Sequence, residues 1–470
     1  MIVEAPRRNR RSDSLLRSHR GFRLLFAADA ISRTGSQITL VALPLTAILM
    51  LHASAQQVGI LVALGTSAFL IAALPVGVWV DRLRRRPVMV AADLIRLLLL
   101  ASVPVAATFG VLSLTQLYVV ALLTGFGNVF FDVAQQSYVS HLLGDDRLID
   151  GFSKLEMVAN GSMLTGPSAG GVLVALVTAP GAIAVDAISY LASAALLVGI
   201  QPREPDAHRS GERSRLHREI SVGLRYVTGH PVLRLIALNG MTGLLFEYAL
   251  LTLQPLLLVR ALGLHPAVYG LVTGGIAIGG VVGSVLANRV IAKLGIARSL
   301  WLPLVVTCPL LLVMPLVSHG WQVVPYPLGY TVFMFGLAFQ NVAQVSYRQA
   351  ICPPELRGRM NATMRFLTWG MMPLGALLGG FVAQAAGVWV ALWVCVIGMM
   401  ASIAPMLAKP VRRLSRDARW RGTMWARSAG GLLGTVQATG ATTQGCTGAT
   451  TQGREQVMAS NVGSGPDGGV

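Results

Sequence analysis

Ionisable residues inside long apolar segments are the residues of this chain most able to do chemistry. Asp29 and Arg33 lie four residues apart in the first apolar segment, so they share one helix face and can pair. Asp132 and Glu247 lie within two later apolar segments. A charge at the centre of a membrane-spanning helix costs about 2.5–3.5 kcal/mol on insertion scales, so such residues tend to mark an ion or substrate pathway.

These acids differ in their expected roles. Glu247 has no basic residue within a helical turn, and a carboxyl group without a counter-ion in apolar surroundings can bind and release a proton reversibly. Asp29 could serve only to neutralise Arg33, and Asp132 could be a solvated helix end. We predict proton coupling at Glu247, Asp29 and Asp132, place Arg33 in the substrate cavity, and expect Asp186 to be a structural hydrogen-bonding acid.

A polar stripe and several aromatic residues supply the expected ligand contacts. Four polar side chains recur every three or four residues near the tenth apolar segment, largely on one helix face: Gln340, Asn341, Gln344 and Arg348. This face suits hydrogen bonding to an oxygen-rich ligand, or it packs polar groups between helices; both readings stay open. Four residues could form the apolar wall of a poorly specific site: Phe131, Phe246, Phe335 and Phe339.

The elements that must position these residues are membrane helices. The chain has 470 residues, of which 54% are hydrophobic and only 12% are charged, which excludes three soluble domains. We expect an all-α membrane protein with twelve transmembrane helices in two six-helix repeats, each long enough for a hydrocarbon core of about 30 Å. The expected spans are 22–50, 56–80, 87–109, 114–134, 155–178, 181–200, 232–259, 268–292, 296–317, 323–345, 364–386 and 387–408.

The charges orient these spans. Lys and Arg number 38 against 20 Asp and Glu, a formal net charge of +18, and the basic residues lie in every second connection. The positive-inside rule therefore predicts that both termini and the central linker are on the cytoplasmic side. We expect the protein to lie in the inner membrane, with its basic residues orienting the chain rather than binding nucleic acid. The four cysteines lie too far apart in sequence to indicate a metal site or a disulfide framework. We expect no cofactor, no metal and no cleaved signal peptide.

The two sets of six spans repeat in sequence. Most matches need a shift of 209 residues, and one needs 211: Ser137-Tyr138 with Ser346-Tyr347, Gly166 with Gly375, Gly170-Gly171 with Gly379-Gly380, and Gly59 with Gly270. Repeated halves with a substrate path between them are typical of alternating-access transporters. The expected parts are a basic cytoplasmic N-terminus 1–21, an N-terminal six-helix half 22–200, a cytoplasmic amphipathic linker 201–231, a C-terminal half 232–408 and a disordered cytoplasmic tail 409–470.

A loop after the second span resembles a signature of the major facilitator superfamily, G-x-x-x-D-R-x-G-R-R. Arg84 stands where the signature has its second Gly. The resemblance implies a latch in which the acid caps a helix of the other half and basic residues hold acids or lipid head groups. The matching residues are Gly77, Asp81, Arg82, Arg85 and Arg86.

The repeat extends this latch to the other half of the molecule. Glu156 and Arg365 are equivalent positions, and Lys293 lies near the position equivalent to Asp81. Opposite charges could then meet across each interface, Asp81 with Arg365 and Lys293 with Glu156. We expect these two pairs to close the cytoplasmic side.

The fifth span contains the sequence G-P-S-A-G-G, which resembles the G-P-x-x-G-G motif of proton-coupled drug antiporters in the same superfamily. There the Pro kinks the helix and the glycines allow close packing against the other half. The residues are Gly166, Pro167, Gly170 and Gly171. The Arg that many drug antiporters carry in the fourth span is missing, with Ala121 near the expected place.

Three further segments, 130–138, 344–350 and 358–366, look like the branch of the superfamily with enterobactin exporters and macrolide and tetracycline efflux proteins. The resemblance implies a secondary active transporter that exports amphipathic small molecules of the antibiotic or multidrug type, by proton antiport. The alternatives are a dedicated exporter of a siderophore or other natural product, and a non-transporting membrane sensor. An enzyme is not expected. The expected partners are a small-molecule substrate, protons and membrane lipids, with a monomeric chain.

Overall fold

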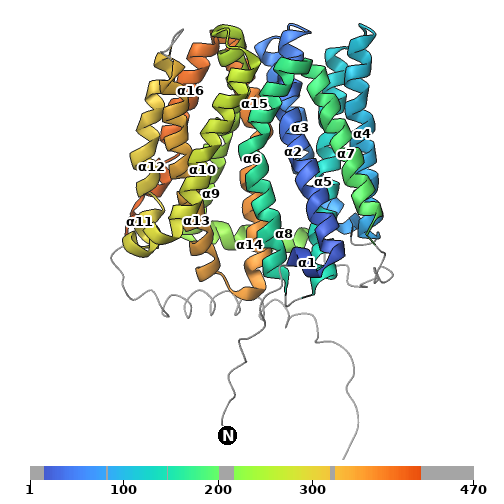
Figure 1. The fold of residues 1–470 in the computed structure, drawn as a ribbon. Helices are drawn as coiled ribbons and strands as arrows, with labels where there is room; N and C mark the ends of the chain where they lie inside the picture. The colour runs from blue at the N-terminus through green and yellow to red at the C-terminus, as the bar shows by residue number, and fades with distance from the viewer. Residues whose placement is uncertain (1–14, 81–82, 145–146, 201–215, 318–322, 414–470) are drawn as a thin grey trace, which may run out of the picture. The chain divides into compact units, whose positions relative to one another are not determined.

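The computed structural model describes residues 15–80, 83–144, 147–200, 216–317 and 323–413. Within these ranges every regular element is a helix (Figure 1). The described residues belong to one compact unit, Met1–Arg416, which is separate from residues Asp417–Val470. That second segment, which holds most of the expected tail, lies outside the described residues.

The first half of the described chain contains a short helix and then six long ones, which we call the N-terminal half. His19 and Ser113 lie just before two of these helices, and their side chains accept hydrogen bonds from backbone N–H groups of the first turn. The helices are α1 (Leu15–Ser18), α2 (Arg20–Leu49), α3 (Ala55–Val80), α4 (Arg85–Thr108), α5 (Leu114–Leu143), α6 (Leu148–Val177) and α7 (Ala179–Val198).

The remaining helices follow the linker helix α8 (Leu216–Gly229), and α9 to α16 form what we call the C-terminal half. The segment 296–317 changes helix type along its length, and Pro309 and Pro315 lie in its 3-10 part, where proline removes backbone donors. The elements are α9 (Pro231–Pro255), η2 (Leu256–Ala261), α10 (Pro266–Leu294), α11 (Ile296–Ser299), α12 (Leu302–Thr307), η3 (Cys308–Leu316), α13 (Pro325–Ile351), α14 (Pro354–Trp369), α15 (Met371–Ala386), α16 (Val388–Ala401), η5 (Ala404–Leu407) and α17 (Lys409–Arg413).

Nine helical segments of the described chain are long and apolar enough to cross a membrane. The all-helical membrane fold is therefore confirmed. The three other long helices, α2, α6 and α13, have 30, 30 and 27 residues but are more polar than these nine. They carry many of the polar residues singled out in the sequence. That these three helices also cross the membrane, which would complete the expected twelve spans, stays a prediction.

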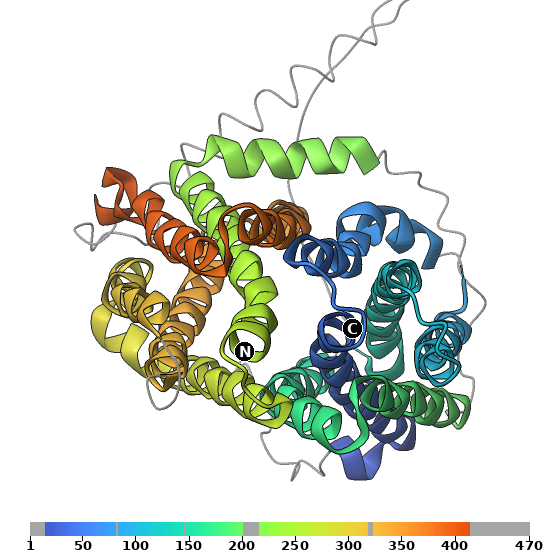
Figure 2. The same cartoon turned by 90° about the horizontal axis from the view of Figure 1, so that it is seen from above.

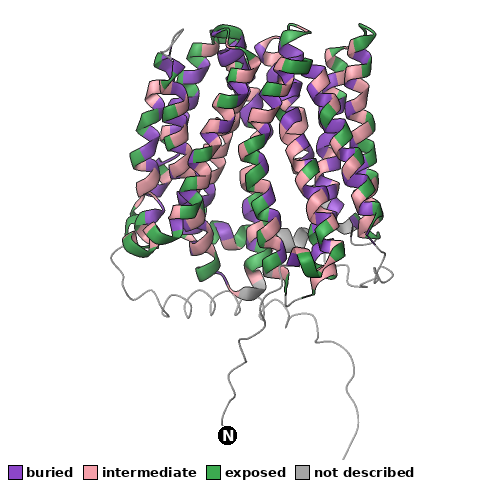
Figure 3. Cartoon of the chain, in the orientation of Figure 1, coloured by how far each residue is buried: buried purple, intermediate pink, exposed green. Residues whose placement is uncertain are grey.

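Within the first compact unit, the N-terminal half lies beside the C-terminal half (Figure 2). The two halves contact each other mainly where α6 packs on α10 and where α3 packs on α15. Buried residues follow the inner helix faces, and exposed residues follow the outer ones (Figure 3). Many exposed side chains are large and apolar, such as Leu98 and Leu176 at 70% and 75% exposure, which identifies hydrocarbon as their solvent.

Two glycine crossings join the halves at equivalent positions of the repeat. A Cβ added to Gly171 of α6 would lie 2.5 Å from the Cα of Gly270 of α10. A Cβ added to Gly59 of α3 would lie 2.9 Å from the Cα of Gly380 of α15. Only glycine permits backbones to approach this closely. Both crossings lie near the starts of α3 and α10, at the end of the bundle away from the basic connections.

The halves separate toward the opposite end. A Cβ added to Gly161 of α6 or to Gly280 of α10 would meet no atom within 4 Å, and Met157 of α6 is 72% exposed. The described helices therefore touch at one end and stand apart at the end that carries the basic connections. The linker helix α8 stays with the C-terminal half, because its Gly223 abuts Thr363 of α14.

Candidate functional site

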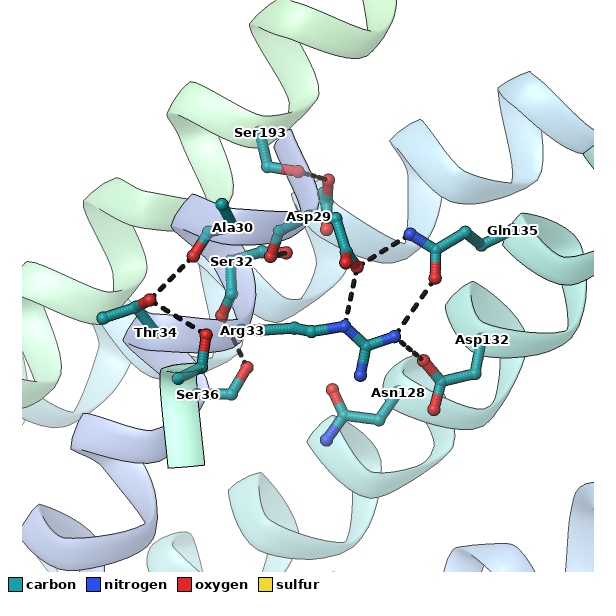
Figure 4. A network of polar contacts seen from close by, with 12 residues as sticks. Asp29, Ala30, Ser32, Arg33, Thr34, Ser36, Asn128, Asp132, Gln135 and Ser193 are labelled. Carbon is teal, nitrogen blue, oxygen red and sulfur yellow. Dashed lines mark hydrogen bonds and ion pairs between the residues drawn. The ribbon is translucent and has the colours of Figure 1, made fainter. Parts of the chain in front are cut away.

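A polar cluster joins α2 to α5 (Figure 4). Arg33 Nε donates to Asp29 Oδ1 at 2.8 Å, and Gln135 Nε2 donates to the same oxygen at 2.7 Å. Arg33 Nη2 also donates to Asp132 Oδ1 at 3.3 Å and to Gln135 Oε1 at 3.1 Å. We call these four residues the Asp29 cluster. The structure thus brings together three of the residues expected from the sequence.

The Asp29 cluster connects the buried interior to an accessible surface. The side chain of Asp29 is fully buried, that of Arg33 is 33% exposed and that of Asp132 is 60% exposed. Oδ2 of Asp29 is buried without a hydrogen-bond partner. Sequence reasoning missed Gln135, although it lies three residues after Asp132 and so near it on the helix surface.

A second, fully buried network lies deeper in the N-terminal half. Asp93 pairs with Arg96 within α4 and accepts a hydrogen bond from Ser193 Oγ of α7 at 2.7 Å. The Arg96 guanidinium lies 4.7 Å from the ring centroid of Phe131 and 4.2 Å from that of Tyr190. Phe131 is only 3% exposed, so in this structure it packs on Arg96 and does not form an exposed wall.

This network also bears on the arginine missing from the fourth span. Arg96 of α4 donates to Asn128 Oδ1 of α5 at 2.7 Å, and Arg33 of α2 reaches Asp132 of α5. Two guanidinium groups therefore reach α5 from neighbouring helices.

Asp186 of α7 accepts hydrogen bonds from Thr39 and Ser189, as expected for a structural acid.

The C-terminal half carries a neutral network at the corresponding place. Asn239 Oδ1 of α9 accepts hydrogen bonds from Gln340 Nε2 at 3.2 Å and from Gln344 Nε2 at 3.0 Å, both on α13. Asn239 Nδ2 donates to the carbonyl oxygen of Ser402 at 2.7 Å. Gln340 and Gln344 are buried, so the polar stripe here packs helices together. Asn341, in contrast, is exposed.

The two networks are related by the sequence repeat. A shift of 209 residues places Gln135 on Gln344, and a shift of 210 places Asp29 on Asn239. The same hydrogen bond therefore recurs in both halves, with an amide in place of the carboxylate. Gly243 stands where the N-terminal half has Arg33. Sequence reasoning missed Asn239, because an Asn in an apolar segment carries no charge to attract attention.

Glu247 lies in the middle of α9 and is half-buried. Among the described residues its side chain makes neither a hydrogen bond nor an ion pair, and Tyr330 of α13 lies within electrostatic range of it. Its neighbour Phe246 packs against Gly398 of α16. Phe335 packs through its backbone against Gly283 of α10 and is half-buried.

The remaining expected cavity residues lie on α13. Phe339 is 3% exposed and so belongs to the packed core. Arg348 is half-buried, and its Nε is buried without a hydrogen-bond partner.

The expected latch is only partly visible. Asp81 and Arg82 lie outside the described residues, while Gly77 falls in α3. Arg86 donates to the carbonyl oxygens of Leu197 at 2.8 Å and of Val198. It thereby satisfies the C-terminus of α7 in its own half, and Arg85, beside it, is half-buried.

Of the two expected charge pairs of the latch, Asp81 with Arg365 lies outside the described residues because Asp81 does. Arg365 itself stacks on Trp369 and lies 5.7 Å from the ring of Phe69 of α3.

Lys293 and Glu156 make no ion pair with each other within the described chain, and Glu156 lies within electrostatic range of Arg33. The crossing of Gly274 with Leu164 sets the register of α10 on α6. In that register Lys293 lies about 16 Å beyond the level of Glu156.

The antiporter-type motif packs in two directions. Gly166 and Gly170 contact Gln37 and Ile38 of α2, in their own half. Gly171 contacts Gly270 of the other half, and the carbonyl oxygen of Pro167 also faces Gly270. The motif thus holds α6 between α2 and α10.

A helical bundle of two equivalent halves, joined by glycine crossings and carrying charged residues inside, is typical of secondary transporters. Residues 15–428 match the family described as "Transmembrane secretion effector". The chain belongs to this family of the major facilitator superfamily.

Curated relatives agree with this family. The chain is 29% identical over 383 residues to the multidrug efflux pump Tap of Mycolicibacterium fortuitum, covering 77% of this chain and 89% of that protein. It is 26% identical over 389 residues to Tap of Mycobacterium tuberculosis, covering 79% and 89%. It is 24% identical over 422 residues to YfiS of Bacillus subtilis, an uncharacterised transporter of the superfamily, covering 85% and 97%.

Solved structures share the fold. The nucleoside transporter NupG superposes with a TM-score of 0.65 at 13% identity, covering 83% of this chain and 100% of that one. A bacterial homologue of the lysosomal transporter Spinster, in an inward-facing and unoccupied conformation, has a TM-score of 0.67 at 15% identity, covering 84% and 97%.

Proposed function

We propose that this multi-pass membrane protein exports amphipathic small molecules across the cytoplasmic membrane in exchange for protons. The observation that carries the proposal is the Asp29 cluster, in which Arg33 bridges a buried carboxylate and an exposed one. Similarity to the multidrug efflux pump Tap supports the direction and the substrate class.

The geometry suggests how one proton changes the cluster. Two carboxylates and one guanidinium carry a net charge of −1, and protonation of Asp29 makes the cluster neutral. Arg33 then loses the charge attraction of Asp29, while Asp132 and Gln135 continue to accept its hydrogen bonds. Since one charge moved through 100 mV is worth about 2.3 kcal/mol, proton entry can drive substrate outward. Glu247 is the second candidate proton carrier.

The orientation is part of the proposal. The basic connections lie at the end where the halves stand apart, and the positive-inside rule places that end in the cytoplasm. The structure then represents an inward-open state in which substrate reaches Asp132 from the cytoplasm. The proposed protein is a monomer in the inner membrane, with both termini cytoplasmic.

The test is accumulation of fluorescent drugs, tetracyclines and macrolides in cells expressing the protein, with and without a protonophore. We expect lower accumulation that the protonophore abolishes and that Asp29→Asn or Glu247→Gln loses. The matched control is Asp150→Asn, which removes an exposed acid paired with Lys154 at the start of α6. It should export like the wild type.

Two other results would change the proposal. Export that persists with the protonophore but requires sodium would replace the coupling ion. No effect on any compound, with the protein shown to be in the membrane, would overturn the multidrug proposal in favour of one dedicated natural product or siderophore.

A further inference from the structure

Both halves contribute to an aromatic cluster where α3 meets α14 and α15. The rings of Phe69 and Trp369 lie 4.6 Å apart between centroids. The Arg365 guanidinium lies 4.2 Å from the Trp369 ring and 5.7 Å from the Phe69 ring. We call these three residues the Trp369 cluster. Phe69 comes from the N-terminal half, and the other two residues come from the C-terminal half.

The Trp369 cluster is incomplete as a packing arrangement. Arg365 is exposed, and among the described residues its side chain makes no hydrogen bond and no ion pair; Phe69 and Trp369 are half-buried. Arg96 shows the complete arrangement, since its guanidinium also stacks on two rings but is 3% exposed and pairs with Asp93. The donors of Arg365 are therefore available to an outside acceptor.

The cluster faces the interior of the molecule. Ile71, two residues after Phe69 and so on nearly the opposite side of α3, is 60% exposed among the lipid-facing residues. Thr368, next to Trp369, contacts Gly240 of α9, the first long helix of the C-terminal half. The Trp369 cluster therefore lies on the side of the contact between α3 and α15 that faces α9.

The cluster is not needed to hold the halves together, because the equivalent contact between α6 and α10 lacks it. Shifts of 209 and 211 residues place Trp369 on Asn160 and Phe69 on Gly280. A Cβ added to Gly280 would meet nothing within 4 Å. The repeat supplies both glycine crossings but only one aromatic cluster.

We propose that the Trp369 cluster binds the planar aromatic part of the exported compound, one that carries an anionic or carbonyl oxygen beside its ring. The inference rests on the proposed function and names a substrate class for it. The ring stacks on Phe69 and Trp369 while the oxygen accepts hydrogen bonds from the Arg365 guanidinium. Because the two halves share the site, their relative movement changes its affinity.

The experiment measures binding of fluorescein, a planar aromatic anion, to the purified full-length protein by fluorescence anisotropy. We expect Trp369→Leu and Arg365→Gln to raise the Kd about tenfold and Phe69→Leu about threefold, which are the losses expected for stacking and cation–π contacts. Trp369→Phe and Arg365→Lys should retain most of the binding. Arg365→Gln should bind ethidium, a planar aromatic cation, at least as tightly as the wild type does.

Each variant has a matched control away from the cluster. Trp393→Leu, Phe381→Leu and Arg298→Gln change residues of the same types on α16, α15 and α11. They should bind fluorescein like the wild type. The proposal is overturned if the wild type does not bind fluorescein, if the cluster variants bind it as the controls do, or if Arg365→Gln weakens ethidium equally.

Transport measured in parallel separates this inference from the proposed function. Fluorescein binding that depends on the cluster, in a protein that exports nothing, would leave the binding site in place and overturn export. Export of several compounds by variants whose fluorescein binding matches the wild type would support export and overturn the site.

Discussion

The two halves of the molecule share a backbone plan but differ in the chemistry of their interiors. The N-terminal half buries Asp29, Asp93 and Asp186 together with Arg96. The C-terminal half places amides at the corresponding helix contact, around Asn239.

The difference shows that the repeat preserves the contacts between helices more strictly than it preserves charge. Gln135 and Gln344 make the same hydrogen bond in the two halves, one to a carboxylate and the other to an amide. Among the described residues, the fully buried charges therefore lie in the N-terminal half.

The substitution with the largest expected effect removes the buried guanidinium group of Arg96. Arg96→Met leaves Asp93 buried without its counter-ion, which should destabilise the fold by about 3–5 kcal/mol. The counterpart Gln344→Leu removes one neutral hydrogen bond and should cost only about 1 kcal/mol. Thermal unfolding of the purified proteins in detergent compares the two. Equal losses would mean that the charged and neutral interiors do not differ in this respect, and Asp93→Asn should partly rescue Arg96→Met.

The glycine crossings should respond alike in both halves. Gly171→Val and Gly380→Val force a side chain into a facing backbone, and such overpacking typically costs about 1–3 kcal/mol. Both should also abolish transport, because the halves can no longer close at that end. Gly275→Val is the control, since a Cβ there meets nothing within 4 Å. A loss of stability and transport in only one of the two variants would show that the two crossings are not equivalent.

A carboxylate placed in the neutral network tests why it is neutral. Asn239→Asp keeps an acceptor for Gln340 and Gln344 but loses the donor to the Ser402 carbonyl oxygen. The expected cost is roughly 1–2 kcal/mol at pH 8 and less at pH 5, where a protonated carboxyl group can donate to that oxygen. Unfolding temperatures at the two pH values provide the measurement. Asn341→Asp, at an exposed position, should show no such dependence.

The smallest expected effect concerns a cap that both halves share. His19 and His230 accept hydrogen bonds from backbone N–H groups at the starts of α2 and α9. Burial lowers the pKa of His230 below its ordinary value. The cap therefore contributes fully above the unfolded pKa and is lost as the pH falls through the lower folded pKa. A cap is worth about 0.5–1 kcal/mol.

His230→Asn tests this cap, because Asn accepts the same hydrogen bond without titrating. Relative to His230→Asn, the wild type should lose stability between pH 7 and pH 5. Parallel unfolding curves for the two proteins over that range would show that the imidazole cap does not matter.

The fold was accessible from the sequence because hydropathy acts over whole segments. The long apolar runs predicted the membrane helices, and the motif around Gly171 predicted close packing against the other half. The spacing of Asp29 and Arg33 predicted their ion pair, since residues four apart meet on any helix. The division into domains and the roles assigned to the site residues stay predictions.

The contacts between helices were not accessible in this way. Whether Arg365 meets an acid or an aromatic ring depends on the register of α14 against α3, and the structure places rings there. Phe131 was expected to line a cavity, but the rotation of α5 directs it onto Arg96. Such outcomes depend on the distance and rotation of two helices far apart in sequence, which no local pattern encodes.

The sequence by itself determined that the chain is a helical membrane protein and which charges share a helix face. The physical reason is that burial in lipid and the helical repeat act locally along the chain. Only the tertiary structure decided which charge remains exposed, which polar groups satisfy one another, and where the halves touch. Those properties depend on how closely helix surfaces approach, and side-chain size at glycine positions such as Gly171 and Gly380 sets that approach.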